Sequence, residues 1–481
     1  ALDAGAEGGG YATWRLDATA HGTADRIEYG AGVNWYGTKG VSAADARNGN
    51  TEADGYGYIG ATVNTRTHID DAVSLDLRGY YSRAHSDFDD GSAYIPSYVP
   101  ADSNAYDTHA LYAGYAGLNA DVCGGKVQNR LAVIATKSDR NYYDSLYDTL
   151  HLNYAYAGSA VRFEYQGTAE LDADTELTFG AETETAAFDN DSYYSYMASE
   201  HADGHKRTTG GYAQIQHTLF DQLTLTGGVR YDDDAEFGSH TSVKIAAAWQ
   251  IPGWDATLRG NYGNGFKAPT LYQLYSAYSN PVADLEPETA RGWEIGFDKT
   301  LFSGRLTASI TWFERRTKNQ IDYLSCYGDP TAAGCADRAY GYYVNLDRTK
   351  AQGLEASIAA NITDTLKFTA NYTDMSAHDR TTGLDLARRP QIMAGAALTW
   401  TVVAGLNLGT SVEFTGKRFD DAAETTTLGE YATVGLFGDY RLDQTWQLYG
   451  RIDNLFDDRT ERAFGYGTEG MSASFGIRAH I

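Results

Sequence analysis

The stretch Val73-Ser74-Leu75-Asp76-Leu77-Arg78 carries apolar side chains at its odd positions and polar side chains at its even positions. Residues 446–453, Trp-Gln-Leu-Tyr-Gly-Arg-Ile-Asp, alternate in the same way near the other end of the chain. Successive side chains of a β-strand point to opposite faces, so each stretch predicts a strand with one apolar and one wet face. Similar stretches recur through the 481 residues without a helical segment, which predicts an all-β protein.

Short and long connections alternate between these stretches. The short ones fall at 21–25, 68–72, 119–126, 171–174, 220–222, 251–255, 302–304, 362–365, 402–405 and 442–445, and the longer ones at 37–55, 84–105, 139–158, 189–207, 234–239, 266–288, 319–341, 378–387, 420–429 and 457–468. With a tight turn at Gly8-Gly9-Gly10, they separate 22 strands. An even strand number with short turns on one side and long loops on the other is typical of outer-membrane barrels. We predict one domain, residues 1–481, folded as a transmembrane antiparallel 22-stranded β-barrel with short periplasmic turns and long extracellular loops.

The two faces of the predicted strands assign side chains to lipid or to the barrel interior. We expect the lipid-facing side to include Trp14, Leu16, Ile310, Trp312, Leu398 and Trp400. We expect the interior to include Arg15, Asp17, Asp76, Arg78, Arg230, Asp232, Arg451 and Asp453. Strands about 4.8 Å apart and tilted by about 40° close a barrel of this strand number at roughly 40–45 Å across, too wide for side chains to fill. The interior therefore holds water or a plug.

Composition narrows the class of protein further. The chain has 64 acidic against 38 basic residues, a net charge of −26, which argues against nucleic acid because phosphates require a basic surface. Apolar content of 42% suits a barrel, in which only alternate residues touch lipid. No apolar run approaches the roughly 18 residues that a membrane helix requires. We expect a bacterial outer-membrane location.

Two of the three cysteines, Cys326 and Cys335, fall in one predicted loop that contains Gly and Pro. An oxidising compartment permits a disulfide between them, and the alternative is two free thiols. Cys123 lies in a short turn, and we assign it no role.

Several motifs of the C-terminal half resemble those of TonB-dependent outer-membrane transporters, and the resemblance is closest to the cobalamin transporters. The motif residues are Gly265, Phe266, Lys267, Ala268 and Pro269, then Glu288 and Glu294, then Glu355, Arg389, Pro390, Asn454, Leu455 and Phe456. The N-terminal half matches by strand pattern alone. The motifs suit barrel assembly and loop anchoring, because proline cannot donate ladder hydrogen bonds and marks where pairing stops.

The resemblance implies an N-terminal plug preceded by a segment that engages TonB, and neither is found in these residues. We therefore expect the barrel of a monomeric transporter for a scarce bulky nutrient, and a wide passive pore when the plug is missing. The alternatives are a ferric-siderophore receptor barrel and an engineered plug-less pore. We expect no enzyme, because nothing combines a nucleophile motif with a base on the outer rim.

The cobalamin transporters also carry loop aspartates that bind calcium. The matching residues here are Asp87, Asp89, Asp90, Asp139, Asp144 and Asp148, and a solvated acidic loop is the alternative. Clustered carboxylates supply the oxygen ligands that calcium prefers. We expect no other cofactor.

Tyr193, Tyr194 and Tyr196 would suit a siderophore, or form an aromatic girdle. His201, Asp203 and His205 have metal-ligand chemistry but are otherwise a solvated loop.

Overall fold

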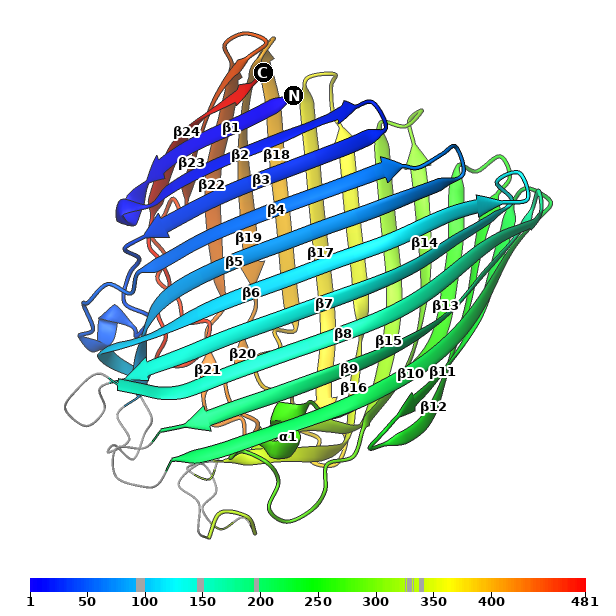
Figure 1. Ribbon diagram of the computed structural model, residues 1–481. Helices are drawn as coiled ribbons and strands as arrows, with labels where there is room; N and C mark the ends of the chain where they lie inside the picture. The colour runs from blue at the N-terminus through cyan, green and yellow to red at the C-terminus, as the bar shows by residue number, and fades with distance from the viewer. Residues whose placement is uncertain are drawn as a thin grey trace.

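The computed structural model is a closed antiparallel barrel of 22 strands (Figure 1), which confirms the predicted fold class and strand number. The structure describes residues 1–91, 100–144, 151–193, 199–324, 326, 331, 333–336 and 341–481. None of the helices in these residues is long and apolar enough to cross a membrane.

The barrel strands follow one another in chain order, each paired with its neighbours in sequence. Their bounds are β1 Leu2–Gly9, β2 Trp14–Ala24, β3 Ile27–Thr38, β4 Tyr56–His68, β5 Val73–Gly91, β6 Pro100–Val122, β7 Val127–Asp144, β8 His151–Asp172, β9 Thr175–Ser192, β10 Glu200–Leu219, β11 Leu223–Asp234, β12 Gly238–Ile251, β13 Ala256–Lys267, β14 Glu288–Leu301, β15 Leu306–Leu324, β16 Tyr342–Asn361, β17 Leu366–Asp379, β18 Ile392–Val403, β19 Leu406–Thr415, β22 Tyr431–Arg441, β23 Trp446–Asp453 and β24 Ser472–His480. A separate two-stranded ribbon is formed by β20 Arg418–Phe419 and β21 Thr427–Leu428. The helical elements are α1 Leu271–Tyr275, η1 Gly10–Ala12 and η2 Ala46–Asn48.

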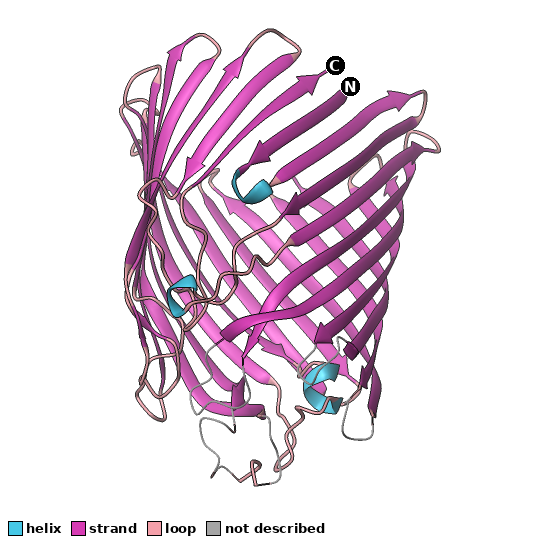
Figure 2. Cartoon of the chain, turned by 90° about the vertical axis from the view of Figure 1, so that its left-hand side faces the viewer, coloured by secondary structure: helices cyan, strands magenta, loops and turns pink. Residues whose placement is uncertain are grey.

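The barrel closes where its first strand meets its last. β1 pairs with β2 on one side and with β24 on the other, so that Ala6 lies opposite both Leu16 and Ile477. Both termini therefore lie at the end of the barrel that carries the short turns (Figure 1). The long loops and α1 lie at the opposite end (Figure 2), which we call the loop-bearing end.

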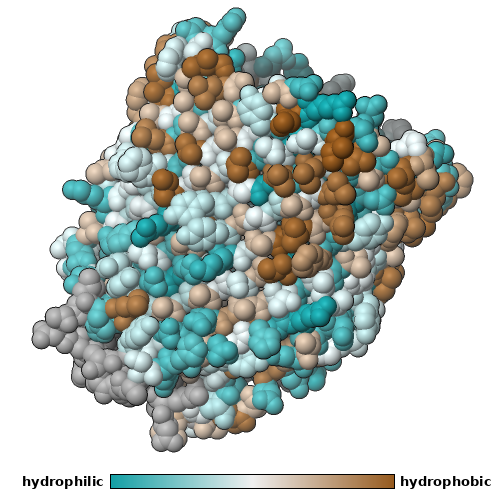
Figure 3. Space-filling model, in the orientation of Figure 1, coloured by the Kyte–Doolittle hydropathy of each residue, from teal (hydrophilic) through white to brown (hydrophobic). Residues whose placement is uncertain are grey.

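The strand faces match the sequence pattern. Leu16, Trp312 and Trp400 are 46%, 41% and 49% exposed on the outer face, as lipid contact requires. Asp76 is 3% exposed and paired with Arg66 at 2.7 Å on the inner face. Apolar side chains gather toward the short-turn end of the outer surface, and polar ones predominate toward the loop-bearing end (Figure 3).

The strands at the loop-bearing end are longer than the sequence predicts, and this corrects several loop assignments. The regions 84–105, 139–158 and 189–207 were expected as loops, but β5 continues to Gly91, β7 to Asp144 and β9 to Ser192. A strand that extends beyond the membrane has water on both faces, so its apolar–polar alternation fades while its backbone pairing continues.

Candidate functional site

The loop that follows β13 is tied down at both ends and turns toward the interior. Lys267, the last residue of β13, pairs with Glu288, the first of β14, at 3.0 Å, which joins the two ends of the loop 268–287. Pro269 is fully buried, and its carbonyl oxygen accepts a hydrogen bond from Nζ of Lys206 at 3.2 Å. Lys206 lies in β10, so this hydrogen bond holds the start of the loop against the inner face of the barrel wall.

Helix α1 begins directly after this anchor. Thr270 caps it through a capping box: its Oγ1 accepts from the N–H of Gln273 at 3.2 Å, and Oε1 of Gln273 accepts from the N–H of Thr270 at 2.9 Å. The cap satisfies backbone donors of a helix too short to be stable alone. Leu271 is 7% exposed on the buried side. The helix packs against β9 and β10 and places Tyr272 among the side chains of the inner wall.

Tyr272 is the centre of what we call the aromatic cluster. Its ring centroid lies 5.7 Å from Tyr156, 5.8 Å from Phe188, 6.1 Å from Tyr278 and 6.2 Å from Tyr343, and Tyr343 lies 5.6 Å from Tyr323. These separations are those of favourable edge and tilted ring contacts. The cluster therefore links β8, β9, β15 and β16 through α1 and its loop.

The aromatic cluster faces the barrel interior. Tyr156 shares its face of β8 with Arg162, which pairs across the inner wall with Glu184 of β9 at 2.7 Å. Phe188 shares the face of Glu184 on β9. Tyr323 is 44% exposed, and Tyr156, Tyr272 and Tyr343 are half-buried, so ring surface remains open to a ligand. Burial of Tyr272 raises the pKa of its phenol, which keeps that hydroxyl neutral.

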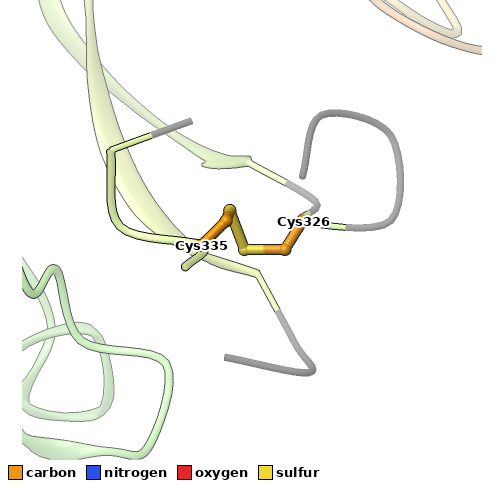
Figure 4. The surroundings of a disulfide bond; sticks show 2 residues. All are labelled: Cys326 and Cys335. Atoms are coloured by element: carbon orange, nitrogen blue, oxygen red, sulfur yellow. A yellow bond between two sulfur atoms is a disulfide. The ribbon is translucent and has the colours of Figure 1, made fainter. Parts of the chain in front are cut away.

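A disulfide supports one side of this cluster. Cys326 and Cys335, predicted as a pair, are bonded in the structure with an S–S distance of 2.00 Å and a Cα–Cα distance of 5.4 Å (Figure 4). Both are nearly buried and pack with Tyr342, which is 4% exposed and adjoins Tyr343 of the cluster. The disulfide thus fixes the chain segment next to Tyr343, whose ring contacts that of Tyr272. Cys123 is a free, exposed thiol in a turn.

An acidic cluster of Glu52, Asp54 and Asp89 lies between the 39–55 loop and the end of β5, with one carboxylate oxygen of each within 4.8 Å of the others. Asp89 is 3% exposed and accepts hydrogen bonds from Oγ of Ser42 at 2.9 Å and the N–H of Ala44 at 2.7 Å. One carboxylate oxygen of Asp54 is buried without a hydrogen-bond partner. Burial, together with the nearby Asp89 charge, raises the pKa of Asp54 to about 7. Oxygen ligands of this kind fit a hard cation such as calcium.

The described aspartates among the six predicted calcium ligands lie in two strands. Asp87, Asp89 and Asp90 lie in β5, and Asp139 and Asp144 lie in β7, all in strands where loops had been expected. Asp87 bonds to His85 at 2.9 Å, Asp139 pairs with Lys137 at 2.9 Å, and Asp144 is 3% exposed. Asp148 lies outside the described residues, as does the side chain of Asp90. Within the described residues, Asp89 alone of the six enters a potential metal cluster.

The other predicted ligand residues are only partly described. Tyr193 is 38% exposed at the end of β9, whereas Tyr194 and Tyr196 lie outside the described residues. His201, Asp203 and His205 lie in β10 and not in a loop. His201 bonds to Asp191 of β9 at 2.9 Å and points to the outer face, away from the aromatic cluster.

The remaining family motifs hold loops and strand ends. Phe266 stacks on His240 with ring centroids 4.0 Å apart, and Asn261 donates to Glu294 at 2.6 Å. Asn454 has a positive φ of 50°, and its side chain accepts from the N–H of Asp458 at 3.0 Å and donates to the Asp458 carbonyl at 2.8 Å. Two other motif residues lie in strands, Gly265 in β13 and Glu355 in β16. The rest lie outside the strands: Ala268, exposed Arg389, Pro390, Leu455 and Phe456, which is 74% exposed.

Ion pairs line the inner wall between the aromatic cluster and the short-turn end of the barrel. Arg130 pairs with Glu164 at 3.0 Å, Arg230 with Glu182 and Asp232 at 2.6 Å, Arg259 with Asp298 at 2.9 Å, and Arg451 with Glu7 at 3.2 Å. These side chains face a wet interior, since charged groups avoid an apolar one.

Sequence reasoning missed the aromatic cluster, because its members come from segments far apart in the chain. The region 139–158, which contains Tyr154 and Tyr156, was expected as a loop, so no strand face could be assigned to these rings; the structure places both on the inner face of β8.

Comparisons with known proteins agree with this architecture. A vitamin B12 transporter of Photobacterium profundum is 27% identical over 430 residues, which cover 87% of this chain and 64% of that protein. An iron-regulated outer membrane virulence protein of Vibrio cholerae is 27% identical over 322 residues, which cover 63% of this chain and 48% of that protein. The chain thus spans less than two thirds of the length of these relatives.

Solved structures of similar fold are siderophore receptors. The receptor PiuA of Acinetobacter baumannii superposes with a TM-score of 0.78 at 15% identity, covering 99% of this chain and 81% of that one. The ferripyoverdine receptor of Pseudomonas aeruginosa gives 0.80 at 14% identity, covering 99% and 71%. At these identities the likeness concerns the fold alone. The family described as TonB dependent receptor-like, beta-barrel matches residues 3–455, and with its closed 22-stranded barrel this chain belongs to that family of outer-membrane receptors.

Proposed function

We propose that the complete protein containing this barrel imports a scarce bulky nutrient, a corrinoid such as cobalamin in preference to a ferric siderophore, with energy supplied through TonB. The observation that carries the proposal is the aromatic cluster at the loop-bearing end. Its half-exposed rings offer flat apolar surface to a large ring-shaped ligand. The similarity to a vitamin B12 transporter supports the same ligand class.

The charges around the cluster favour a corrinoid over an anionic iron chelate. The cation–π contacts among the described residues fall on Tyr115, Tyr212, Tyr431 and Tyr449, outside the cluster. The basic group that reaches the base of α1, Lys206, is bonded to the Pro269 carbonyl and lies 3.9 Å from Asp234. A ligand of high negative charge would therefore meet little compensation there. The siderophore alternative is supported by the iron-regulated relative.

Titration of the complete protein with cyanocobalamin tests the proposal. Tyr156→Ala removes one ring of the cluster and is expected to weaken binding about tenfold, the loss of one good aromatic contact. Tyr115→Ala is the matched control, because Tyr115 is a half-buried tyrosine on the inner face of β6 outside the cluster, and its loss should leave the affinity unchanged. Binding of ferric siderophores but not of cyanocobalamin would establish the alternative, and equal affinity of both variants would refute the site.

We further propose that calcium orders the loop-bearing end through the acidic cluster of Glu52, Asp54 and Asp89. The support is the set of closely spaced oxygens and the buried, unbonded oxygen of Asp54. A bound divalent cation would offset the like charges and tie the 39–55 loop to β5.

A further inference from the structure

A row of basic side chains crosses four neighbouring strands on the outer face of the barrel. The strand register aligns Arg291 of β14 with Arg316 of β15, Arg316 with Lys350 of β16, and Lys350 with His378 of β17. The row lies on the outer face because Arg316 shares the parity of Ile310 and Trp312, both exposed to lipid. The intervening Thr311 points inward, where it accepts a hydrogen bond from Arg259 at 2.6 Å.

A second row continues the basic surface toward the loops. Lys318 lies opposite Arg348, and the N–H of Arg380 bonds to the Arg348 carbonyl at 2.8 Å. Arg291, Lys318, Arg348 and Arg380 are exposed. We call this surface the basic patch; it consists of Arg291, Arg316, Lys318, Arg348, Lys350 and Arg380.

The row formed by Arg291, Arg316 and Lys350 carries more positive charge than the one acid paired with it neutralises. Glu314 pairs with Arg316 at 2.7 Å and with Lys350 at 3.0 Å. Among the described side chains, the further acids on the outer faces of β14–β17 are Asp374, toward the short-turn end, and Asp322, toward the loops. Like charges directly opposite on adjacent strands destabilise a sheet. Glu314 offsets one of the three aligned charges, so the row keeps positive charge that a further anion would stabilise, in a chain whose net charge is −26.

The depth of the patch in the membrane favours a lipid headgroup as its anionic partner. Trp293 is 41% exposed and lies on the same face as Arg291, two residues nearer the short-turn end of the barrel. Ile295 and Trp312, which lie opposite each other, come next in that direction. Exposed tryptophans mark the level where hydrocarbon meets headgroups. Two residues rise about 7 Å along a strand, which places the row at headgroup depth. Basic clusters at that depth attract anionic lipids.

We propose that the basic patch binds the phosphate groups of an anionic lipid of the outer leaflet. The guanidinium groups of Arg291 and Arg316 supply forked donors for phosphate oxygens, and the Lys350 ammonium adds a point charge. Another part of the wall differs, because the outer face at the loop-bearing end of β9 and β10 carries Asp189, Asp191 and Asp203. The lipid therefore binds at β14–β17 and not at β9 and β10.

Lipid retention measured by native mass spectrometry tests the proposal on the purified protein in detergent. The probes are lipid A, which carries two phosphates, and phosphatidylcholine as the zwitterionic control. Arg291→Gln/Arg316→Gln/Lys350→Gln is expected to lower lipid A occupancy at least tenfold. The matched control is Arg83→Gln/Lys137→Gln/Arg207→Gln, which removes the same charge from outer-face positions on β5, β7 and β10 and should retain lipid A.

Equal lipid A loss in both triple variants, or in neither, overturns the proposal. If the patch variant fails to fold, the single variant Arg291→Gln decides, with an expected loss of about threefold. Wild-type binding should also weaken as salt rises, because the contact is electrostatic. Displacement of lipid A by an equal concentration of inorganic phosphate would show a free-phosphate site and contradict a lipid site.

Discussion

The carboxylate of Asp421 organises the short loop between β20 and β21. It accepts hydrogen bonds from the N–H groups of Ala423, Thr425 and Thr426 at 3.0, 3.1 and 2.7 Å and from Oγ1 of Thr425 at 3.0 Å. Burial raises the pKa of this carboxyl, but the hydrogen bonds outweigh it and hold the pKa below its ordinary value of 3.8. The neighbouring Asp420 pairs with Arg388 at 2.7 Å, so the loop also anchors the segment that contains Arg389 and Pro390.

Asp421→Asn should loosen this loop at neutral pH, because the amide NH2 that replaces one carboxylate oxygen cannot accept the hydrogen bonds that this oxygen accepts. A loss of about 1 kcal/mol corresponds to roughly fivefold faster hydrogen exchange at the N–H groups of Thr425 and Thr426. The pKa of Asp421 is lower in the folded protein than in the unfolded chain. The stabilisation that its carboxylate gives to the loop is therefore complete above pH 3.8 and is lost as the pH falls through the folded pKa. Wild type and variant should then exchange alike. The turn held by Asp443 is the internal control, and equal exchange at neutral pH would contradict the prediction.

At the level of elements, the strands inside the membrane could be predicted and their extensions could not. The alternation of Val73, Leu75 and Leu77 with polar residues marks β5 within lipid, but beyond it both faces are wet and the pattern fades. His201 and Asp203 were consequently assigned to a loop, although they pair in β10. The disulfide was predictable because Cys326 and Cys335 are close in sequence. The aromatic cluster was not, because register between distant strands decides which rings meet.

The 39–55 loop and the end of β5 form a unit that calcium should stabilise. Bound calcium would join the carboxylates of Glu52, Asp54 and Asp89, so the loop should resist protease in calcium and be cut at least several-fold faster in chelator. Mass spectrometry of the fragments over time measures the difference. Glu52→Gln should abolish the calcium effect, and Asp364→Asn, which changes an exposed acid at the other end of the barrel, should preserve it. Unchanged cleavage rates with and without calcium would exclude an ion there.

For the whole molecule, the paired charges of the wall predict how residues 1–481 behave when inserted alone in a bilayer. The interior is too wide for side chains to fill, so planar-bilayer recordings should show large, steady conductance. Selectivity for cations should be mild, because wall acids are partly compensated, as where Glu182 and Asp232 share the cation of Arg230. Arg230→Gln leaves those acids uncompensated and should raise the preference for cations. A closed trace from correctly folded protein would mean that the loops seal the interior.

The seam between β1 and β24 has a consequence for biogenesis. Leu2 and Ile481 exchange backbone hydrogen bonds at 2.7 and 2.8 Å, so the ring is completed only when the first strand of the barrel pairs with the last. Until β24 is available, the growing barrel has two open strand edges, each able to pair with a foreign strand. Closure must therefore wait for the synthesis of β24, and factors that cover those edges would protect the unclosed barrel from aggregation. A circular permutant that links the termini and opens in a long loop would move this vulnerable stage to another part of the wall.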